Sequence, residues 1–186
     1  MKDDIRLGII LLIITAVSGF LLGFAQKITK EPIAIQEQKT KSEAMQIILP
    51  SATEFKASNK QASGLIKEVN EGYNGSKIDG YILRVDPKGY GGLIDMMVGI
   101  STDGKITGIK ILSHSETPGL GANAPNPKFS GQYTNKPAKE LKVVKGEASG
   151  DDQISALTGA TITSRAVTTG VNEAVKFYDS NLKGGK

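Results

Sequence analysis

The chain has 186 residues, 23 of them basic and 19 acidic, and carries a formal net charge of +4 at pH 7. It contains no cysteine and a single histidine, His114, which excludes disulfides, iron–sulfur ligation, thiolate chemistry and a multi-histidine metal site. The basic residues form no stripe and tryptophan is absent, so the sequence carries no sign of nucleic-acid binding.

The first predicted element is a transmembrane helix. Residues 7–24 (LGIILLIITAVSGFLLGF) contain no charge, and as a helix they are about 27 Å long, enough to span a bilayer core. The alternative is a cleaved secretory signal with a cleavage site at Gly23-Phe24-Ala25, but the apolar run exceeds the usual signal-peptide core. We therefore assign residues 1–30 to a membrane anchor and expect the short N-terminus inside the cell and the domain outside it.

A second helix is expected after the membrane segment. Pro32 is suited to the first turn of a helix, and the apolar residues that follow among charges continue to Leu49, where Pro50 ends the pattern. We assign residues 31–60 to this linker helix and a connection, and residues 61–186 to a single domain.

Three strands are predicted next, over residues 77–85, 92–100 and 105–113. The pair Asp103-Gly104 predicts a tight hairpin between the last two, with positive φ at both residues. Because the connections are short, the sheet is expected to be mostly antiparallel.

The last predicted element is an amphipathic helix over residues 164–181, which places Val167, Val171, Ala174 and Val175 at helical spacing. Six hydroxyl side chains lie at or near its start, and Thr163 or Ser164 is expected to cap it, with Thr168 and Thr169 on its face. The predicted fold class is α+β: one N-terminal transmembrane helix, then a domain with a mostly antiparallel sheet and flanking helices.

Two loops of small residues have the character of binding segments. In SETPGLG (residues 115–121), Pro118-Gly119 suits the centre of a type II turn; considered alone, this is a simple turn with a solvated Glu116. In TGATITS (residues 158–164), Gly159 and Ala160 lack bulk just before a helix start, where free N–H groups and the helix dipole favour an anion. Neither loop is a Walker loop or a dinucleotide fingerprint.

The membrane segment, GYGG at residues 89–92, SETPGLG and TGATITS, in this order and at these distances, resemble the covalent-FMN subunits of membrane redox pumps. The similarity is greatest to the G subunits of the Rnf complex, an ion-translocating ferredoxin:NAD⁺ oxidoreductase. The C subunits of the sodium-pumping NADH:quinone reductase (NqrC) are related but usually longer. The resemblance covers nearly the whole chain, and it extends the domain prediction to an FMN-binding domain.

The resemblance implies one covalent FMN per chain, joined by a phosphoester to Thr161 through the action of a flavin transferase. Glu116, Thr117 and Leu120 should line the isoalloxazine, with the backbone of Gly119 and Gly121 nearby. Lys145 is a possible further contact or a solvated lysine. The expected cofactor site comprises Gly159, Ala160, Thr161, Ile162, Thr163, Ser164, Glu116, Thr117, Gly119, Leu120 and Lys145; no metal ligand and no acid–base or nucleophilic group is expected.

The implied function is electron relay between neighbouring flavin or iron–sulfur subunits of a complex in the plasma membrane, from a single-pass chain whose domain is extracytoplasmic. Two alternatives remain open: an NqrC-like subunit, and a single-pass FMN-binding sensory or regulatory module. The chain departs from the family pattern at one position, because Ser155 stands six residues before Thr161, where the family usually has aspartate. Asp151 and Asp152 lie just before it.

Overall fold

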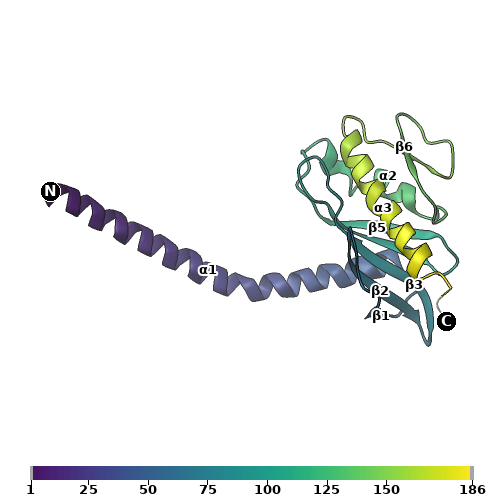
Figure 1. Cartoon of the computed structure of the whole chain (residues 1–186), viewed down its shortest axis with the longest axis horizontal. Helices are drawn as coiled ribbons and strands as arrows, with labels where there is room; N and C mark the ends of the chain where they lie inside the picture. Colours follow the sequence, from purple (N-terminus) through teal and green to yellow (C-terminus); the bar gives the residue numbers. More distant parts are fainter. Residues whose placement is uncertain (1, 185–186) are drawn as a thin grey trace. The chain divides into compact units, whose positions relative to one another are not determined.

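The computed structural model of the chain describes residues 2–184, in two compact units that meet between Lys41 and Ser42. The first helix, α1 (Lys2–Ile48), runs from one unit into the other (Figure 1). Among the described residues it is the one helix long and apolar enough to cross a membrane, with a mean hydropathy of 2.5 over its most apolar window. Pro32 lies inside α1, so the prediction that it opens a second helix is wrong. A proline removes one backbone N–H, and here the helix continues on both sides of that gap.

The second unit contains a five-stranded sheet in the order β1-β2-β3-β4-β5, with every neighbouring pair antiparallel. The strands are β1 (Glu54–Ala57), β2 (Ile66–Asn74), β3 (Lys77–Val85), β4 (Asp95–Ser101) and β5 (Ile106–Ser113). The mostly antiparallel sheet expected from the sequence is confirmed, and β3 has the expected bounds. β1 and β2 were not expected, because β1 is a largely exposed edge strand and β2 carries charged residues among its buried ones.

The hairpin between β4 and β5 differs from the prediction. Gly104 has a φ of +79°, while Asp103 has an ordinary negative φ. The Gly104 N–H donates to the Ser101 carbonyl (3.0 Å) and the Ser101 N–H donates to the Lys105 carbonyl (2.9 Å), which leaves three residues in the turn. A three-residue loop needs only one left-handed residue, at its last position, to match the twist of the strands.

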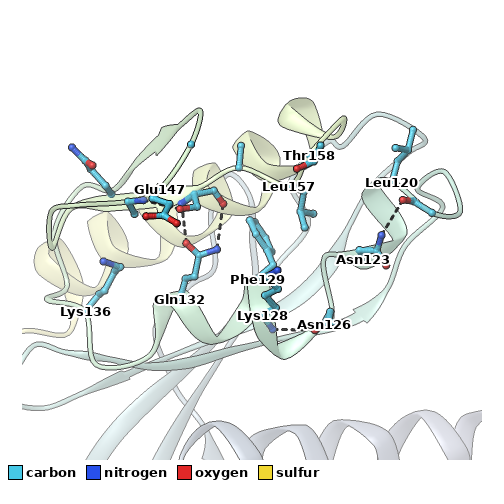
Figure 2. A pocket seen from close by; sticks show the side chains of 16 residues that line it. Leu120, Asn123, Asn126, Lys128, Phe129, Gln132, Lys136, Glu147, Leu157 and Thr158 are labelled. Atoms are coloured by element: carbon cyan, nitrogen blue, oxygen red, sulfur yellow. Dashed lines mark hydrogen bonds between the residues drawn. The ribbon is translucent and has the colours of Figure 1, made fainter.

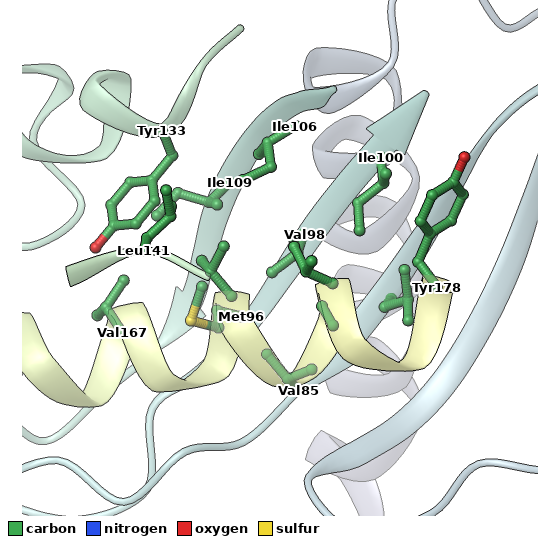
Figure 3. Close-up of a cluster of buried hydrophobic side chains, with 14 of the residues drawn as sticks. Val85, Met96, Val98, Ile100, Ile106, Ile109, Tyr133, Leu141, Val167 and Tyr178 are labelled. Atoms are coloured by element: carbon green, nitrogen blue, oxygen red, sulfur yellow. The ribbon is translucent and has the colours of Figure 1, made fainter. Parts of the chain in front are cut away.

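One face of the sheet is covered by α3 (Thr161–Asn181), which begins three residues earlier than predicted. Figure 1 shows α3, in yellow, lying across the strands. Figure 3 shows the apolar side chains packed between helix and sheet. The residues labelled there are Val85, Met96, Val98, Ile100, Ile106, Ile109, Tyr133, Leu141, Val167 and Tyr178.

The opposite face of the sheet is covered by the end of α1. A second buried cluster joins Ala44, Met45, Ile48, Leu49 and Ala52 to Ile82 of β3 and Met97 of β4. Glycines in three strands make room for it: a Cβ at Gly72 would lie 2.5 Å from Leu49 Cδ2, and one at Gly99 would overlap Ile48. The compact unit that contains the sheet therefore begins near Ser42, and residues 42–60, which belong to the segment expected to be a linker helix and a connection, contribute a packed helix end and β1.

The segment between β5 and α3 is built from short elements. These are η1 (Gly121–Asn123), α2 (Pro127–Ser130), η2 (Gly131–Tyr133) and two short parallel strands, β6 (Lys142–Val144) and β7 (Gln153–Ser155). They lie between the two loops that the sequence singles out, and they form one side of the site described next.

Candidate functional site

Glu116 is the point at which three separate segments of the chain meet. Its side chain is buried, with 6% of the residue exposed, which corrects the reading of a solvated turn residue. Oε1 accepts a hydrogen bond from the Gly91 N–H (2.9 Å), and Oε2 accepts one from the Thr163 hydroxyl. One carboxylate therefore joins the GYGG turn, the SETPGLG loop and the first turn of α3.

Glycine is required where these segments approach one another. A Cβ at Gly89 or Gly121 would collide with the Glu116 carboxylate, and one at Gly91 would overlap the Ser115 carbonyl. These close contacts explain why the motifs contain glycine and no larger residue at these positions.

The SETPGLG loop has the predicted type II turn. The Leu120 N–H donates to the Thr117 carbonyl at 3.2 Å, and Gly119 has a φ of +77°, which glycine adopts without strain. Thr117 and Leu120 are exposed, whereas the Glu116 N–H donates to His114 Nδ1 at 3.2 Å. The loop thus turns its acid inward and its threonine and leucine outward.

The N-terminus of α3 carries no side-chain cap. Ala160 is the N-cap residue, after Gly159 with a φ of +74°, and the first intrahelical bond is made by the Ser164 N–H to the Ala160 carbonyl. The prediction that Thr163 or Ser164 caps this helix is wrong. The Thr163 hydroxyl donates to Glu116, while the Ser164 hydroxyl donates to the Ala160 carbonyl (2.9 Å) and accepts from the Leu157 N–H (2.9 Å).

This helix start has the properties of an anion site. The N-cap residue, Ala160, makes no side-chain capping bond to the N–H groups of the first turn, and the positive end of the helix dipole lies there. Thr161 is half-buried at the first helical position and Ile162 is exposed. Thr161 thus keeps partial exposure to solvent, and a phosphate ester at its oxygen is electrostatically compatible with this helix start.

Further along α3 the hydroxyls are structural. The Thr168 hydroxyl donates to the Ser164 carbonyl (2.9 Å) and lies 2.7 Å from the Tyr133 phenol oxygen. Burial raises the pKa of Tyr133 above its ordinary value, with the Thr168 bond opposing that shift. Thr168 is therefore buried, and of the two threonines expected on the helix face only Thr169 is exposed.

A cavity of about 880 Å³ opens beside the helix start (Figure 2). This volume is within the range of sites for small molecules and cofactors. At one end it is lined by Gly119, Leu120, Leu157 and Thr158, which belong to the two motif segments or adjoin them. The rest of the lining comes from the short elements: Asn123, Asn126, Lys128, Phe129, Gln132, Lys136, Gly146, Glu147, Ala148, Gln153, Ser155 and Ala156.

The structure brings Glu116 to Thr163 and Leu120 to Gly159, but of the expected site residues only Gly119 and Leu120 line the cavity, and Thr161 does not. Leu120 lies against the turn before α3: a Cβ built on Gly159 would be 2.9 Å from Leu120 Cδ2. Lys145 is exposed and does not line the cavity, although the next residue, Gly146, does. Sequence reasoning missed Phe129 and Gln132, whose elements are only a few residues long and give no periodic signal.

Exposed apolar side chains mark the same region. From Ser42 to Gly184 the large exposed hydrophobic residues are Ile47, Tyr90, Leu93, Leu120 and Ile162, and all but Ile47 belong to the segments that meet at Glu116 or adjoin them. In the described part of the chain, no group of three or more histidine or acidic residues is placed to hold a metal ion.

Residues 89–176 match the FMN-binding domain family. The G subunit of the proton-translocating ferredoxin:NAD(+) oxidoreductase complex of Clostridium ljungdahlii is 40% identical over 171 residues, which cover 91% of this chain and 88% of that protein. The G subunit of the Na(+)-translocating complex of Acetobacterium woodii is 40% identical over 197 residues, covering 98% and 95%.

Solved structures agree on the fold. The chain is similar to the C subunit of the Na(+)-translocating NADH-quinone reductase of Parabacteroides distasonis, with a TM-score of 0.61 at 20% identity over 81% of this chain and 96% of that one. It is also similar to NqrC of Shewanella oneidensis, with a TM-score of 0.50 at 20% identity over 69% and 67%. Because the sequence similarity to the G subunits covers almost the full length of both proteins, the chain belongs to the family of G subunits of ion-translocating ferredoxin:NAD(+) oxidoreductase complexes.

Proposed function

We propose that the chain is the electron-transfer subunit of a membrane-bound, ion-translocating ferredoxin:NAD⁺ oxidoreductase, and that it works through FMN joined to Thr161 by a phosphoester. The observation that carries the proposal is the meeting of three motif segments at Glu116, beside an uncapped helix start and a cavity of cofactor size. The match of residues 89–176 to the FMN-binding domain family and the identity of the relatives support it.

The residues present fit the two halves of FMN. The phosphate, which keeps one negative charge as a diester, suits the free N–H groups of the first turn of α3. The ring system suits the adjacent cavity, where Leu120, Phe129 and Leu157 supply apolar contacts, and where asparagine and glutamine side chains, two lysines and Glu147 supply polar ones. Bound FMN supplies the redox chemistry, since it accepts and donates one or two electrons.

Attachment requires the Thr161 hydroxyl as a nucleophile toward phosphorus. Thr161 Oγ1 forms a bond to the phosphorus of an activated flavin nucleotide, the phosphoanhydride bond to the leaving nucleotide breaks, and the hydroxyl proton is released. A separate enzyme, the flavin transferase, catalyses this step. Thr161 is then an attachment point with no further part in electron transfer.

The remaining site residues take two kinds of role in this proposal. Thr117, Leu120 and Ile162 are exposed at the site and contact the cofactor, whereas the Glu116 carboxylate is used within the protein, where both oxygens accept hydrogen bonds. Glu116 therefore positions the loops around the ring. Lys145, exposed after β6, is kept as a further contact on the basis of resemblance alone.

The proposed setting is a single-pass subunit with its domain on the extracytoplasmic side of the plasma membrane. The apolar helix α1 and the membrane complexes of the relatives support membrane association. The partners proposed are the membrane, iron–sulfur and flavin subunits of the same complex, with the flavin transferase as a partner during maturation.

Attachment is tested by producing the full chain together with a flavin transferase and comparing Thr161→Val with Thr169→Val, an exposed threonine on the same helix. The wild type and Thr169→Val should fluoresce in a denaturing gel and gain the mass of one FMN less one water. Thr161→Val should be dark and unmodified. A fluorescent Thr161→Val, or a dark wild type, would overturn the proposal.

A further inference from the structure

Gln132 makes an unusual contact with the strand that leads to the Thr161 motif. Its side-chain Oε1 accepts a hydrogen bond from the Ser155 N–H (2.8 Å), and its Nε2 donates to the Ser155 carbonyl (3.2 Å). Figure 2 shows both bonds as dashed lines from Gln132 at the wall of the cavity. One carboxamide thus satisfies both backbone groups of the last residue of β7.

These backbone groups face away from the other short strand. β6 bonds to the residue that follows, since the Ala156 N–H donates to the Val144 carbonyl (2.9 Å). Gln132 therefore takes the place of a second neighbouring strand at Ser155. The Ser155 hydroxyl makes a third contact, accepting a hydrogen bond from the Ala148 N–H (2.8 Å).

The segment between Ser155 and Thr161 has few other fixed points. The Leu157 N–H donates to the Ser164 hydroxyl (2.9 Å) and the Ala160 N–H donates to the Leu157 carbonyl (3.0 Å). Thr158 and Gly159 are exposed at the tip of this turn. The segment is thus held at three residues: at Ser155 by Gln132 and the Ala148 N–H, at Ala156 by the Val144 carbonyl, and at Leu157 by the Ser164 hydroxyl.

We propose that Gln132 is a positioning residue for the attachment of FMN to Thr161, an inference that rests on the proposed function. Its carboxamide fixes the start of the segment that a transferase must recognise, and so determines where the Thr161 hydroxyl lies relative to the cavity that receives the flavin. Without Gln132, β7 keeps β6 on one side and the first turn of α3 still forms, but the segment that leads to Thr161 loses both hydrogen bonds to the Ser155 backbone. A displacement of about 1 Å at a reacting group is enough to lower a rate by about a hundredfold.

The chain contains a matched control for this contact. Asn172, on α3, makes the same two bonds to another backbone residue: its Oδ1 accepts from the Leu141 N–H (2.9 Å) and its Nδ2 donates to the Leu141 carbonyl (2.9 Å). Asn172 is not among the residues that line the cavity. Loss of its carboxamide removes the same number and kind of hydrogen bonds at a residue eleven positions from Thr161 and outside the cavity lining.

The experiment compares Gln132→Met with Asn172→Leu in the full chain in detergent micelles. Attachment by the purified transferase is followed by intact mass over time, at several concentrations of the chain, and each rate is divided by the folded fraction from a urea titration. Asn172→Leu should react at the wild-type rate. Gln132→Met should show a kcat at least about tenfold lower, because the displaced hydroxyl slows the transfer after binding.

Equal rates for Gln132→Met and Asn172→Leu would overturn the inference. If Gln132→Met does not fold, the pair Gln132→Glu and Asn172→Asp provides the same comparison, since each variant keeps the acceptor and loses the donor. Here too Gln132→Glu should react more slowly than Asn172→Asp, and equal rates would refute the role. A wild-type chain that acquires no FMN would refute the proposed function itself, a result distinct from equal rates among modified variants.

Discussion

Replacement of Glu116 tests whether one buried carboxylate holds the site together. Glu116→Ala removes two hydrogen bonds to a charged acceptor and leaves the Thr163 hydroxyl buried without its partner. At about 1.5 to 3 kcal/mol for each such bond, we expect the free energy of unfolding to fall by about 3 to 6 kcal/mol. In Glu116→Gln the amide oxygen still accepts from the Gly91 N–H, and the amide NH₂ can donate to the Thr163 hydroxyl. The free energy of unfolding should therefore fall by only about 1 to 2 kcal/mol.

Urea unfolding of the full chain in detergent, followed by tyrosine fluorescence, measures both changes. With a slope of about 1.5 kcal/mol per molar urea, a loss of about 3 kcal/mol lowers the midpoint by about 2 M. Glu140→Ala, at an exposed glutamate, is the control and should change the free energy of unfolding by less than about 0.5 kcal/mol. A Glu116→Ala variant as stable as the control, or no more damaged than Glu116→Gln, would refute the assigned role.

The sheet faces provide two further tests. A Cβ at Gly99 would overlap Ile48 and Thr107, so Gly99→Ala should lower the free energy of unfolding by about 1 to 3 kcal/mol, while Gly131→Ala, in open space, should be neutral; equal midpoints would contradict this packing. Because burial raises the pKa of Tyr133, its neutral phenol stabilises the fold fully below about pH 10, and stability falls as the unfolded chain ionises above it. Tyr133→Phe should therefore flatten the decline of the urea midpoint between about pH 10 and 11, and an unchanged decline would exclude this tyrosine as its source.

Sequence periodicity predicted the parts of the fold in which local pattern and burial agree. The strand at residues 77–85 contains apolar residues, some of them alternating with polar ones, between clear turn residues. In α3 the apolar residues recur at helical spacing, so both elements were predicted. The end of α1 could not be placed, because nothing local indicates that Ile48 and Leu49 pack against glycines in strands far along the chain. Pro32 misled the prediction because a proline signals a helix start more often than it lies within one.

At the site, the motifs predicted which segments matter and the structure shows how they meet. The turn at Pro118-Gly119 follows from residue types alone and is confirmed. The burial of Glu116 and the two bonds from Gln132 depend on contacts between residues 23 to 47 positions apart, which no local pattern encodes. The capping role expected of Thr163 was wrong because a buried carboxylate competes for its hydroxyl.

The packing of the last turns of α1 against the sheet bears on the order in which the domain folds during synthesis. Residues 42–48 leave the ribosome well before Ile82 and Met97, against which they finally pack. Until those strands are synthesised, the apolar side chains of this helix end lack the strand residues against which they are finally buried. The second buried cluster therefore forms only after β3 and β4 have been synthesised, so the core on this face of the sheet is completed late although its first residues are made early.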